Sequence, residues 1–378
     1  MRILFVGKMP ACGVVIRNSS SWRLGAGIRS ALKAAGFSTE ARRRRQPRGT
    51  SKRSGSPGDP PFPGLLQPEN LSREELVDVL RAAVVDQKGP LVTLNKPQGL
   101  PVTGKPGDLT LLSVLPELNH ALGFGEQELQ IVHAPGKESS GLVLLSSCPQ
   151  TARRLQKYFT HSRRTQTPTA TYYAITDGIP VPSEGKIQAA LKLEYVDGVS
   201  LGVPVKPPSR KDILEGVRRT LSHFRVLTTG SGCALVHLQP LTVFPGQLQV
   251  HMVLQLCPVL GDHTFSARVS TVLGQRFLLP AETTKPQRQV LDEALLRRLH
   301  LTASQAAQLP LHLHLHSLLL PGARPRDVPT ELLAPLPPYF SRTLQLLQLH
   351  QSSSLIPDAR RKAVGVRGEE GCSGARGK

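Results

Sequence analysis

The chain has 378 residues, only 4% of them aromatic, and a formal net charge of +20. This length allows one large domain with tails. No apolar run approaches the roughly 20 residues of a membrane-spanning helix, so we expect a soluble protein without a membrane span. Widely spaced cysteines argue against a zinc site or a disulfide framework and suit a reducing compartment. They are Cys12, Cys148, Cys233, Cys257 and Cys372.

The positive charge gathers at the N-terminus. Residues 1–53 contain thirteen Lys and Arg and one acid, Glu40, whereas residues 54–351 carry a net charge of about +5. Such a modest basic excess is compatible with nucleic-acid binding but does not require it.

The N-terminal segment is typical of a mitochondrial presequence. It is rich in Arg and Ser and nearly free of acids, and a helix of about 100° per residue would separate its apolar and basic side chains. The apolar face holds Leu24, Ile28, Ala31, Leu32 and Ala35, and the opposite face holds Arg23, Arg29 and Lys33. The basic run Arg42–Arg45 could instead be a nuclear signal. Because the amphipathic helix precedes that run, we predict a transit peptide at residues 1–41 and a location in the mitochondrial matrix.

Composition divides the rest of the chain into three parts. Residues 42–70 are rich in Pro, Gly and Ser and are predicted to form a flexible linker. Residues 71–350 hold the apolar patterns of a folded domain. Residues 351–378 are poor in apolar side chains, which predicts a disordered tail.

The domain begins with a helix and a short strand. Ser72 and Glu75 form a capping box that starts a helix predicted over residues 72–86. The strand Leu91–Leu94 then enters a turn whose Lys96 could reach a phosphate, although a lone lysine is more often simply solvated.

The stretch Leu129–Ser146 is predicted to form a strand, a tight loop and a second strand. Turn-forming Pro, Gly and Ser residues separate two apolar runs. A rigid loop between two buried strands can present a reactive group. The alternative is an ordinary connection between strands.

A basic helix follows this loop. Gln150–Phe159 is predicted to be amphipathic, with Arg153, Arg154 and Lys157 on its outward face. Such a face usually meets only solvent. Here it lies just after the loop, so a contact with phosphate is an equal alternative. Thr171–Ile175 then reads as a strand.

The stretch Leu311–His316 alternates Leu and His, which places His312, His314 and His316 on one face of a strand. These side chains could bind a metal ion. However, side chains along one strand project in parallel, and no acid lies near them in sequence. We therefore expect no metal, and no cofactor either. A closing helix is predicted from Tyr339 to Leu349.

Five segments of the chain, in the same order, resemble those of the RluA-type pseudouridine synthases. At the centre, His133 and the run Lys137-Glu138-Ser139-Ser140-Gly141-Leu142 resemble the family's active-site motif, which is His-Arg-Leu-Asp followed by Lys, any residue, Thr, Ser, Gly and Leu. The other four segments are Asn95–Gly99, Thr171–Ile175, Thr242–His251 and Pro258–Asp262. The resemblance covers roughly residues 90–345.

The resemblance implies an α+β fold, with a mixed, largely antiparallel sheet and flanking helices around an RNA-binding groove. It also implies isomerisation of uridine to pseudouridine in RNA, here mitochondrial mRNA or rRNA. Tyr172 matches the family tyrosine that lies against the target base, so it could stack on an extruded uracil. The predicted substrate-binding residues are Tyr172, Lys96, Arg153, Arg154 and Lys157.

The chain departs from the family where the chemistry starts. The family's aspartate corresponds to Gly136, and the arginine that pairs with it corresponds to Phe244. Loss of both avoids an unpaired buried charge and predicts an apolar repacking of the pocket. Glu138, Asp108 and Asp177 are candidates to approach the pocket, although none occupies the family position. We assign no catalytic residue, and whether the chain is an enzyme stays open.

Two interpretations follow. In the first, the protein takes part in mitochondrial RNA pseudouridylation through an unrecognised catalytic group or an active partner. In the second, it is a catalytically inactive RNA-binding or mitoribosome-assembly factor that uses the same fold. RNA is the expected partner in both, and mitoribosome-assembly or RNA-granule proteins are candidate protein partners.

Overall fold

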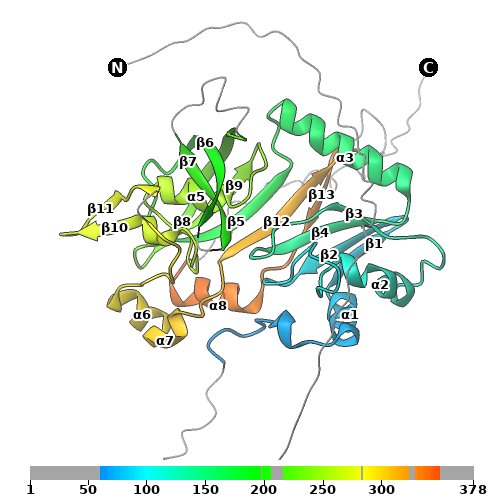
Figure 1. Cartoon of the computed structure of the whole chain (residues 1–378), viewed down its shortest axis with the longest axis horizontal. Coiled ribbons are helices and arrows are strands. Elements are labelled where there is room, and N and C mark those ends of the chain that lie inside the picture. Colours follow the sequence, from blue (N-terminus) through cyan, green and yellow to red (C-terminus); the bar gives the residue numbers. More distant parts are fainter. Residues whose placement is uncertain (1–59, 197, 206–215, 282–283, 323–327, 350–378) are drawn as a thin grey trace, which may run out of the picture. The chain divides into compact units, whose positions relative to one another are not determined.

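The computed structural model describes residues 60–349, apart from residues 197, 206–215, 282–283 and 323–327 (Figure 1). The predicted transit peptide and the predicted C-terminal tail lie outside the described residues, as does most of the predicted linker. In the described part of the chain, no helix is long and apolar enough to cross a membrane.

A large mixed sheet forms the centre of the fold. Its main path, among the described residues, runs β1 (Val84–Lys88), β2 (Leu91–Lys96), β4 (Ser140–Ser146), β12 (Leu313–Leu320), β5 (Ala170–Asp177), β9 (Cys233–Pro240), β8 (Arg218–Gly230), β6 (Glu184–Val196) and β7 (Val199–Val205). Two further strands pair at its side, β3 (Gln130–His133) with β4 and β13 (Thr330–Leu333) with β12. A separate hairpin holds β10 (Val269–Val272) and β11 (Gln275–Leu278).

The pairing confirms the predicted α+β fold with a mixed, largely antiparallel sheet. Among the described strand pairs, only β4 and β12 run parallel. The other pairs, including the long β6–β8 and β8–β9 ladders, are antiparallel. The single parallel contact joins the central loop region to a strand near the end of the domain.

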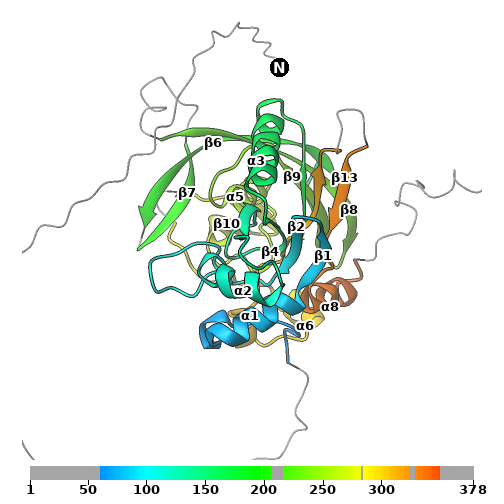
Figure 2. The same cartoon turned by 90° about the vertical axis from the view of Figure 1, so that its right-hand side faces the viewer.

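Helices pack against both faces of the sheet (Figures 1 and 2). They are α1 (Arg73–Ala82), α2 (Leu115–Ala121), α3 (Pro149–Arg164), α5 (Gln247–Leu254), α6 (Glu293–Leu299), α7 (Ala303–Ala306) and α8 (Pro338–Leu346), with 3-10 turns η1 (Pro68–Asn70), η2 (Leu112–Val114) and η3 (Ser266–Arg268). Figure 1 shows α6, α7 and α8 grouped below the sheet and α3 at its upper right.

Alternation along β5 shows which helices cover which face. Ala174 is buried in a cluster with Leu248 and Met252 of α5. Its neighbour Ile175 is buried with Leu295 of α6 and Phe340 of α8. Because successive side chains of a strand point to opposite faces, Tyr172 belongs to the α5 face and Asp177 to the α6–α8 face.

Several elements differ in extent from their predictions. The capping box of Ser72 and Glu75 is confirmed, but α1 ends at Ala82 because the β-branched residues that follow form β1 and pair with β2. Helix α3 continues past the predicted end to Arg164. Strands β6 and β8 each span 13 residues, and no strand was predicted for them above.

Part of the predicted linker packs on the domain. Phe62 and Leu65 contact the apolar cluster of α6 and α8. The Arg342 guanidinium donates to the carbonyl oxygen of Pro60 at 3.1 Å. Apolar side chains within the Pro-rich segment thus extend the described domain to residue 60.

Candidate functional site

The loop of residues 134–139 joins β3 to β4 and is the centre of the candidate site. Strand β4 is buried along its whole length and hydrogen-bonds with β2, β3 and β12. Gly141 has φ +115°, and a β-carbon there would overlap the backbone of Leu315. Glycine is therefore required where β4 passes closest to β12.

Ser140 fixes the end of the loop to β12. Its hydroxyl lies 2.9 Å from Nδ1 of His314, and both side chains are fully buried. Nε2 of His314 faces the carbonyl oxygen of Ala334 at 3.5 Å, so it carries the proton and Nδ1 accepts from Ser140. Burial lowers the pKa of His314 to about 3 and keeps it neutral. This pair holds the loop in place.

Lys96 holds the other side of the loop. It is 1% exposed, and its ammonium group donates to the carbonyl oxygens of Pro97 (3.0 Å), Leu100 (3.0 Å) and Lys137 (3.2 Å). Burial lowers its pKa to about 7. With three carbonyls around it and no path to the surface, the ammonium is not placed to contact a phosphate. The predicted RNA contact of Lys96 does not fit this position, because the lysine is a buried support of the loop.

Gly136 is exposed, and its surroundings are open. Among the described residues, no atom beyond its chain neighbours lies within 4 Å of the place where a β-carbon would stand. Its φ is outside the left-handed region that favours glycine. A side chain would therefore fit at this position without a clash.

Phe244 does not fill the space beside Gly136. Its ring lies against Gly202 of β7, where a β-carbon would be 3.3 Å from Cε1 of the phenylalanine. It packs in the apolar cluster that includes Leu201 and Val203. The expected apolar repacking between the two positions is therefore wrong: Phe244 joins the β6–β7 side, and the loop stays open.

Acidic side chains are present near the loop, but in other roles. Glu138 is exposed, and its charge acts on two buried groups: it offsets part of the lowering of the Lys96 pKa by burial, and it adds a little to the rise that burial gives the pKa of Asp262. Asp177 forms an ion pair with Arg276 on the face of β5 opposite to Tyr172. Asp108 accepts a hydrogen bond from a backbone amide of its own loop. Neither of these last two reaches the loop.

Asp262 is the buried carboxyl group on this side of the fold. Its Oδ1 accepts from the backbone amides of Thr264 and Phe265 at 3.0 Å and from Gln249 at 3.3 Å. Its Oδ2 has no partner among the described residues. Burial raises the pKa of Asp262 to about 6. The family motif has an arginine at the position of Gln249, so a neutral amide replaces a cation beside this carboxyl group.

Tyr172 lies on β5 between Leu238 of β9 and Leu315 of β12. Its half-buried ring contacts both the cluster under α5 and the cluster under α3. Burial raises the pKa of its hydroxyl, which therefore stays neutral. The ring is therefore uncharged and packs between the two clusters, and its role as a stacking surface for a base stays a prediction.

The matched residues of the 242–251 segment serve the fold. The Gln247 side chain donates to Ser222 at 2.9 Å and accepts from Thr242 at 2.9 Å. Nε2 of His251 lies 2.8 Å from the Thr220 hydroxyl. Both contacts join α5 to β8. Local patterns do not indicate these partners, because they are 25 and 31 positions away.

The outward face of α3 is basic, as predicted. Ala152, Leu155 and Phe159 are buried, and Arg153, Arg154 and Lys157 are exposed. A shallow hollow of about 430 Å³ runs along this face. It is lined by Arg153, Gln156, Lys157, Thr160, His161 and Arg164.

Helix α3 is fixed against the strand that leads into the loop. The Phe159 ring lies 5.1 Å from the His133 ring, and Gln156 donates to the carbonyl oxygen of Ile131 at 3.4 Å. Burial, with a smaller contribution from Arg163, lowers the pKa of His133 to about 4. Helix α3, which carries the basic face, therefore packs directly against the strand that leads into the loop.

His314 and His316 of β12, and His312 directly before the strand, each have a contact of their own. His312 lies 2.9 Å from the Thr343 hydroxyl, and the His316 ring stacks on Tyr173 at 4.3 Å. Within residues that the structure describes, no group of three His, Cys, Asp or Glu side chains could hold a metal ion.

Comparisons with known proteins agree with this fold and loop. The family model described as RNA pseudouridylate synthase matches residues 90–253. The human protein named mitochondrial mRNA pseudouridine synthase RPUSD3 is 77% identical over 349 residues, which cover 92% of this chain and 99% of that protein. The chain belongs to the RluA-type RNA pseudouridylate synthase family.

Two further members of the family support this placement. The bovine protein of the same name is 79% identical over 332 residues, covering 88% of this chain and 96% of its own length. The solved structure of human RNA pseudouridylate synthase domain containing 4 matches with a TM-score of 0.57 at 29% identity, covering 73% of this chain and 97% of that one. The human and bovine proteins named mitochondrial mRNA pseudouridine synthase RPUSD3 are mitochondrial by name, in agreement with the location predicted here.

Family membership shows how the differences from the family motif at positions 136 and 244 are to be interpreted. The fold is that of the family, and in this chain Ser140 and Gly141 pair with β12 at the end of the loop. Gly136 and Phe244 therefore lie within a family scaffold.

Proposed function

We propose that this protein binds RNA in the mitochondrial matrix and takes part in the conversion of uridine to pseudouridine in mitochondrial mRNA or rRNA. The observation that carries the proposal is the basic face of α3 fixed beside the family's loop. Identity to proteins named mitochondrial mRNA pseudouridine synthase over nearly their full length supports the process.

In this proposal each part of the candidate site has a task. Arg153, Arg154 and Lys157 supply positive charge for RNA phosphates, whose contacts dominate affinity. Tyr172 offers a ring on which an extruded base can stack. Lys96 and Ser140 keep the loop rigid between these two contacts.

The family's catalytic position in this chain supplies no carboxylate, so catalysis by this chain itself has no assigned residue. The family chemistry needs a positioned carboxylate, either as a nucleophile at the sugar or as a base. Gly136 supplies none, and Glu138 is the carboxylate that the loop carries instead, two positions along the chain. A specific observation, the open space at Gly136, favours a second function: an RNA-binding or mitoribosome-assembly factor without chemistry of its own.

One experiment separates these functions. Base-resolution pseudouridine mapping of mitochondrial RNA, with and without the protein, shows whether any position depends on it. The purified protein is then assayed on RNAs that contain those positions. Loss of modification in cells with no activity in vitro supports an RNA binder that acts with a partner. Activity of the purified protein would refute the inactive interpretation, and Glu138→Gln would then be the first variant to assay. No dependent position would contradict a role in pseudouridylation.

A further inference from the structure

A second hollow lies beside the end of β5, away from the loop. It encloses about 260 Å³ between that strand end, the 266–271 segment, β11 and the 287–290 segment. Asp177 borders it from the face of β5 opposite to Tyr172. Most of its lining side chains are polar: Asp177, Ser266, Ser270, Thr271, Arg276, Gln287, Arg288 and Gln289.

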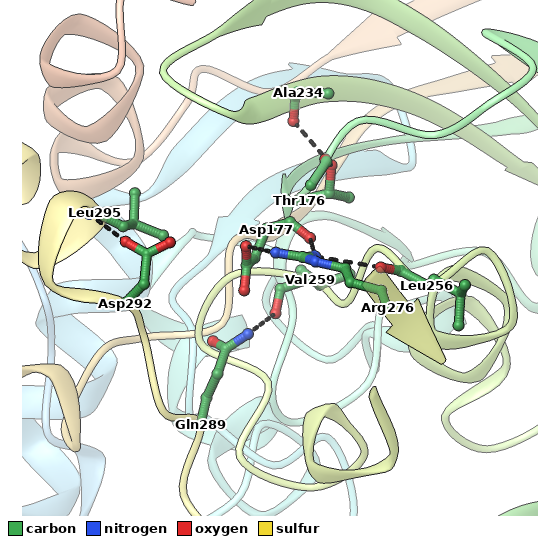
Figure 3. Close-up of polar contacts among 10 residues, drawn as sticks. Thr176, Asp177, Ala234, Leu256, Val259, Arg276, Gln289, Asp292 and Leu295 are labelled. Carbon is green, nitrogen blue, oxygen red and sulfur yellow. Dashed lines mark hydrogen bonds and ion pairs between the residues drawn. The ribbon is translucent and has the colours of Figure 1, made fainter. Parts of the chain in front are cut away.

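Arg276 forms the fixed wall of this hollow (Figure 3). Its Nη2 donates to Oδ1 of Asp177 at 2.6 Å, and its Nη1 donates to the carbonyl oxygens of Asp177 and Leu256. The Arg276 side chain is 29% exposed and is among those that line the hollow. A guanidinium already held in plane loses little freedom when it binds a ligand.

Ser266 provides an independent sign of a ligand. Its side chain is 6% exposed, and its hydroxyl has no hydrogen-bond partner among the described residues. Buried hydroxyl groups without partners destabilise a fold, and most are bonded to protein or to water. Ser266 lines the hollow, and rotation of its hydroxyl group toward a ligand acceptor there would supply the missing bond.

The charge of the lining determines the class of ligand. Two arginines, Arg276 and Arg288, and one carboxylate, Asp177, are among the lining residues, which leaves an excess of one positive charge. Arg288 is exposed and uses Nη1 to donate to the carbonyl oxygen of Ala307. Guanidinium and hydroxyl donors around a positive site match the oxygens of a phosphate.

We propose that this hollow binds a phosphate group, carried either by RNA or by a free mononucleotide. Its volume is larger than one phosphate needs and lies just below the usual range for drug-sized ligands, about 300–1,000 Å³. The apolar side chains of Val269 and Leu279 at its border could contact a ribose. This site is separate from the α3 face and goes beyond the proposed function.

Calorimetric titration of the full chain tests the proposal with three probes: inorganic phosphate, uridine monophosphate and a ten-nucleotide single-stranded RNA. The Arg153→Ala/Arg154→Ala/Lys157→Ala background removes competing binding at α3. In that background, Arg288→Ala should weaken binding about tenfold or more, and Ser266→Ala by several-fold. Ser266→Ala should fold at least as stably as its parent, because the hydroxyl it removes has no partner. Arg81→Ala, an exposed arginine on α1, is the matched control and should change nothing.

The outcomes are distinct. If the two variants lose affinity for the RNA alone, the phosphate belongs to an RNA backbone; if they lose it for the mononucleotide, the ligand is a free nucleotide. Either result supports the site. Unchanged affinity in both variants, or no saturable binding of any probe, would overturn it. None of these measurements depends on pseudouridine formation, so failure here leaves the proposed function standing.

Discussion

Two buried or half-buried cations, Lys96 and Arg276, hold two regions of this molecule in different ways. Lys96 donates all of its hydrogen bonds to backbone carbonyls and is closed off from solvent. Arg276 also donates to carbonyls, but it keeps a carboxylate partner and an exposed edge. The lysine is fully used by the fold, whereas the arginine can serve the fold and still meet a ligand.

Lys96 and Arg276 show why a positively charged side chain in a family motif need not contact the substrate. An ammonium is a point charge with three donors, and three carbonyls are enough to satisfy it. A guanidinium has five donors in a fixed plane, so contacts on one edge leave others available. A functional role should therefore be assigned to a Lys or Arg side chain on this fold according to how many of its hydrogen-bond donors are unused and how exposed the side chain is.

The largest expected effect concerns the contact between β4 and β12. Gly141→Ala should cost about 4 kcal/mol or more in the free energy of unfolding, because the new methyl group meets the backbone of Leu315 and φ is unfavourable for alanine. Urea denaturation measures this loss. Gly136→Ala, five positions earlier in open space, is the matched control and should stay within about 0.5 kcal/mol. Equal effects of the two changes would show that the loop is not anchored as described.

Removing the buried ammonium should have the next largest effect. Lys96→Met keeps the length of the side chain but leaves the carbonyl oxygens of Pro97 and Leu100 without this donor, at a cost of about 2–3 kcal/mol. Lys137→Met, an exposed neighbour of the loop, should be nearly neutral. If the two variants unfold at the same denaturant concentration, Lys96 does not support the loop.

The same lysine predicts a dependence of stability on pH. Its folded pKa of about 7 lies below the unfolded value of 10.5, so the unfolded chain binds more protons between these values. The contribution of Lys96 to stability should therefore rise as pH increases from about 7 to 10. Denaturation of the parent and of Lys96→Met across this range isolates the effect. A constant difference between them would show that the ammonium titrates normally.

Loss of charge on α3 should have a moderate effect on RNA binding. Replacing Arg153, Arg154 and Lys157 with Ala should lower affinity roughly tenfold to a hundredfold and reduce the slope of log affinity against log salt by about 2. Filter binding over a series of salt concentrations measures both. Arg297→Ala/Arg298→Ala on α6 serves as the control, since those arginines lie at the other end of the fold. An equal loss in the control would mean that binding follows net charge and not the α3 face.

The smallest effect on stability is expected at the empty family position. Gly136→Asp should fold with a change of at most about 0.5 kcal/mol, because the site is exposed and open. It should not restore isomerisation by itself, since Phe244 supplies no cation. Gly136→Asp/Phe244→Arg restores both groups. Assays of pseudouridine formation in mitochondrial RNA with each variant test this expectation. Activity of the single variant would show that the arginine is dispensable.

Local patterns predicted much of the fold. The capping box at Ser72, the buried and basic faces of α3, and the histidine face of β12 all follow from neighbours a few residues apart. The family resemblance supplied the sheet. What the sequence did not predict depends on distant partners. The residues around Ser140 do not indicate its contact with His314. An exposed Lys96 is the natural prediction from its neighbours, because they do not indicate the three carbonyl groups that surround the ammonium.

The contact between β4 and β12 also sets an order for assembling the protein. Ser140 and His314 are 174 positions apart, so the loop cannot reach its final form until most of the domain has been synthesised and brought together. A chain that stopped before residue 313 would contain every residue of the loop and still lack the strand that shapes it. Shortened products of this gene would therefore carry the motif without the site, and a sequence match to the motif alone would overstate what they can do.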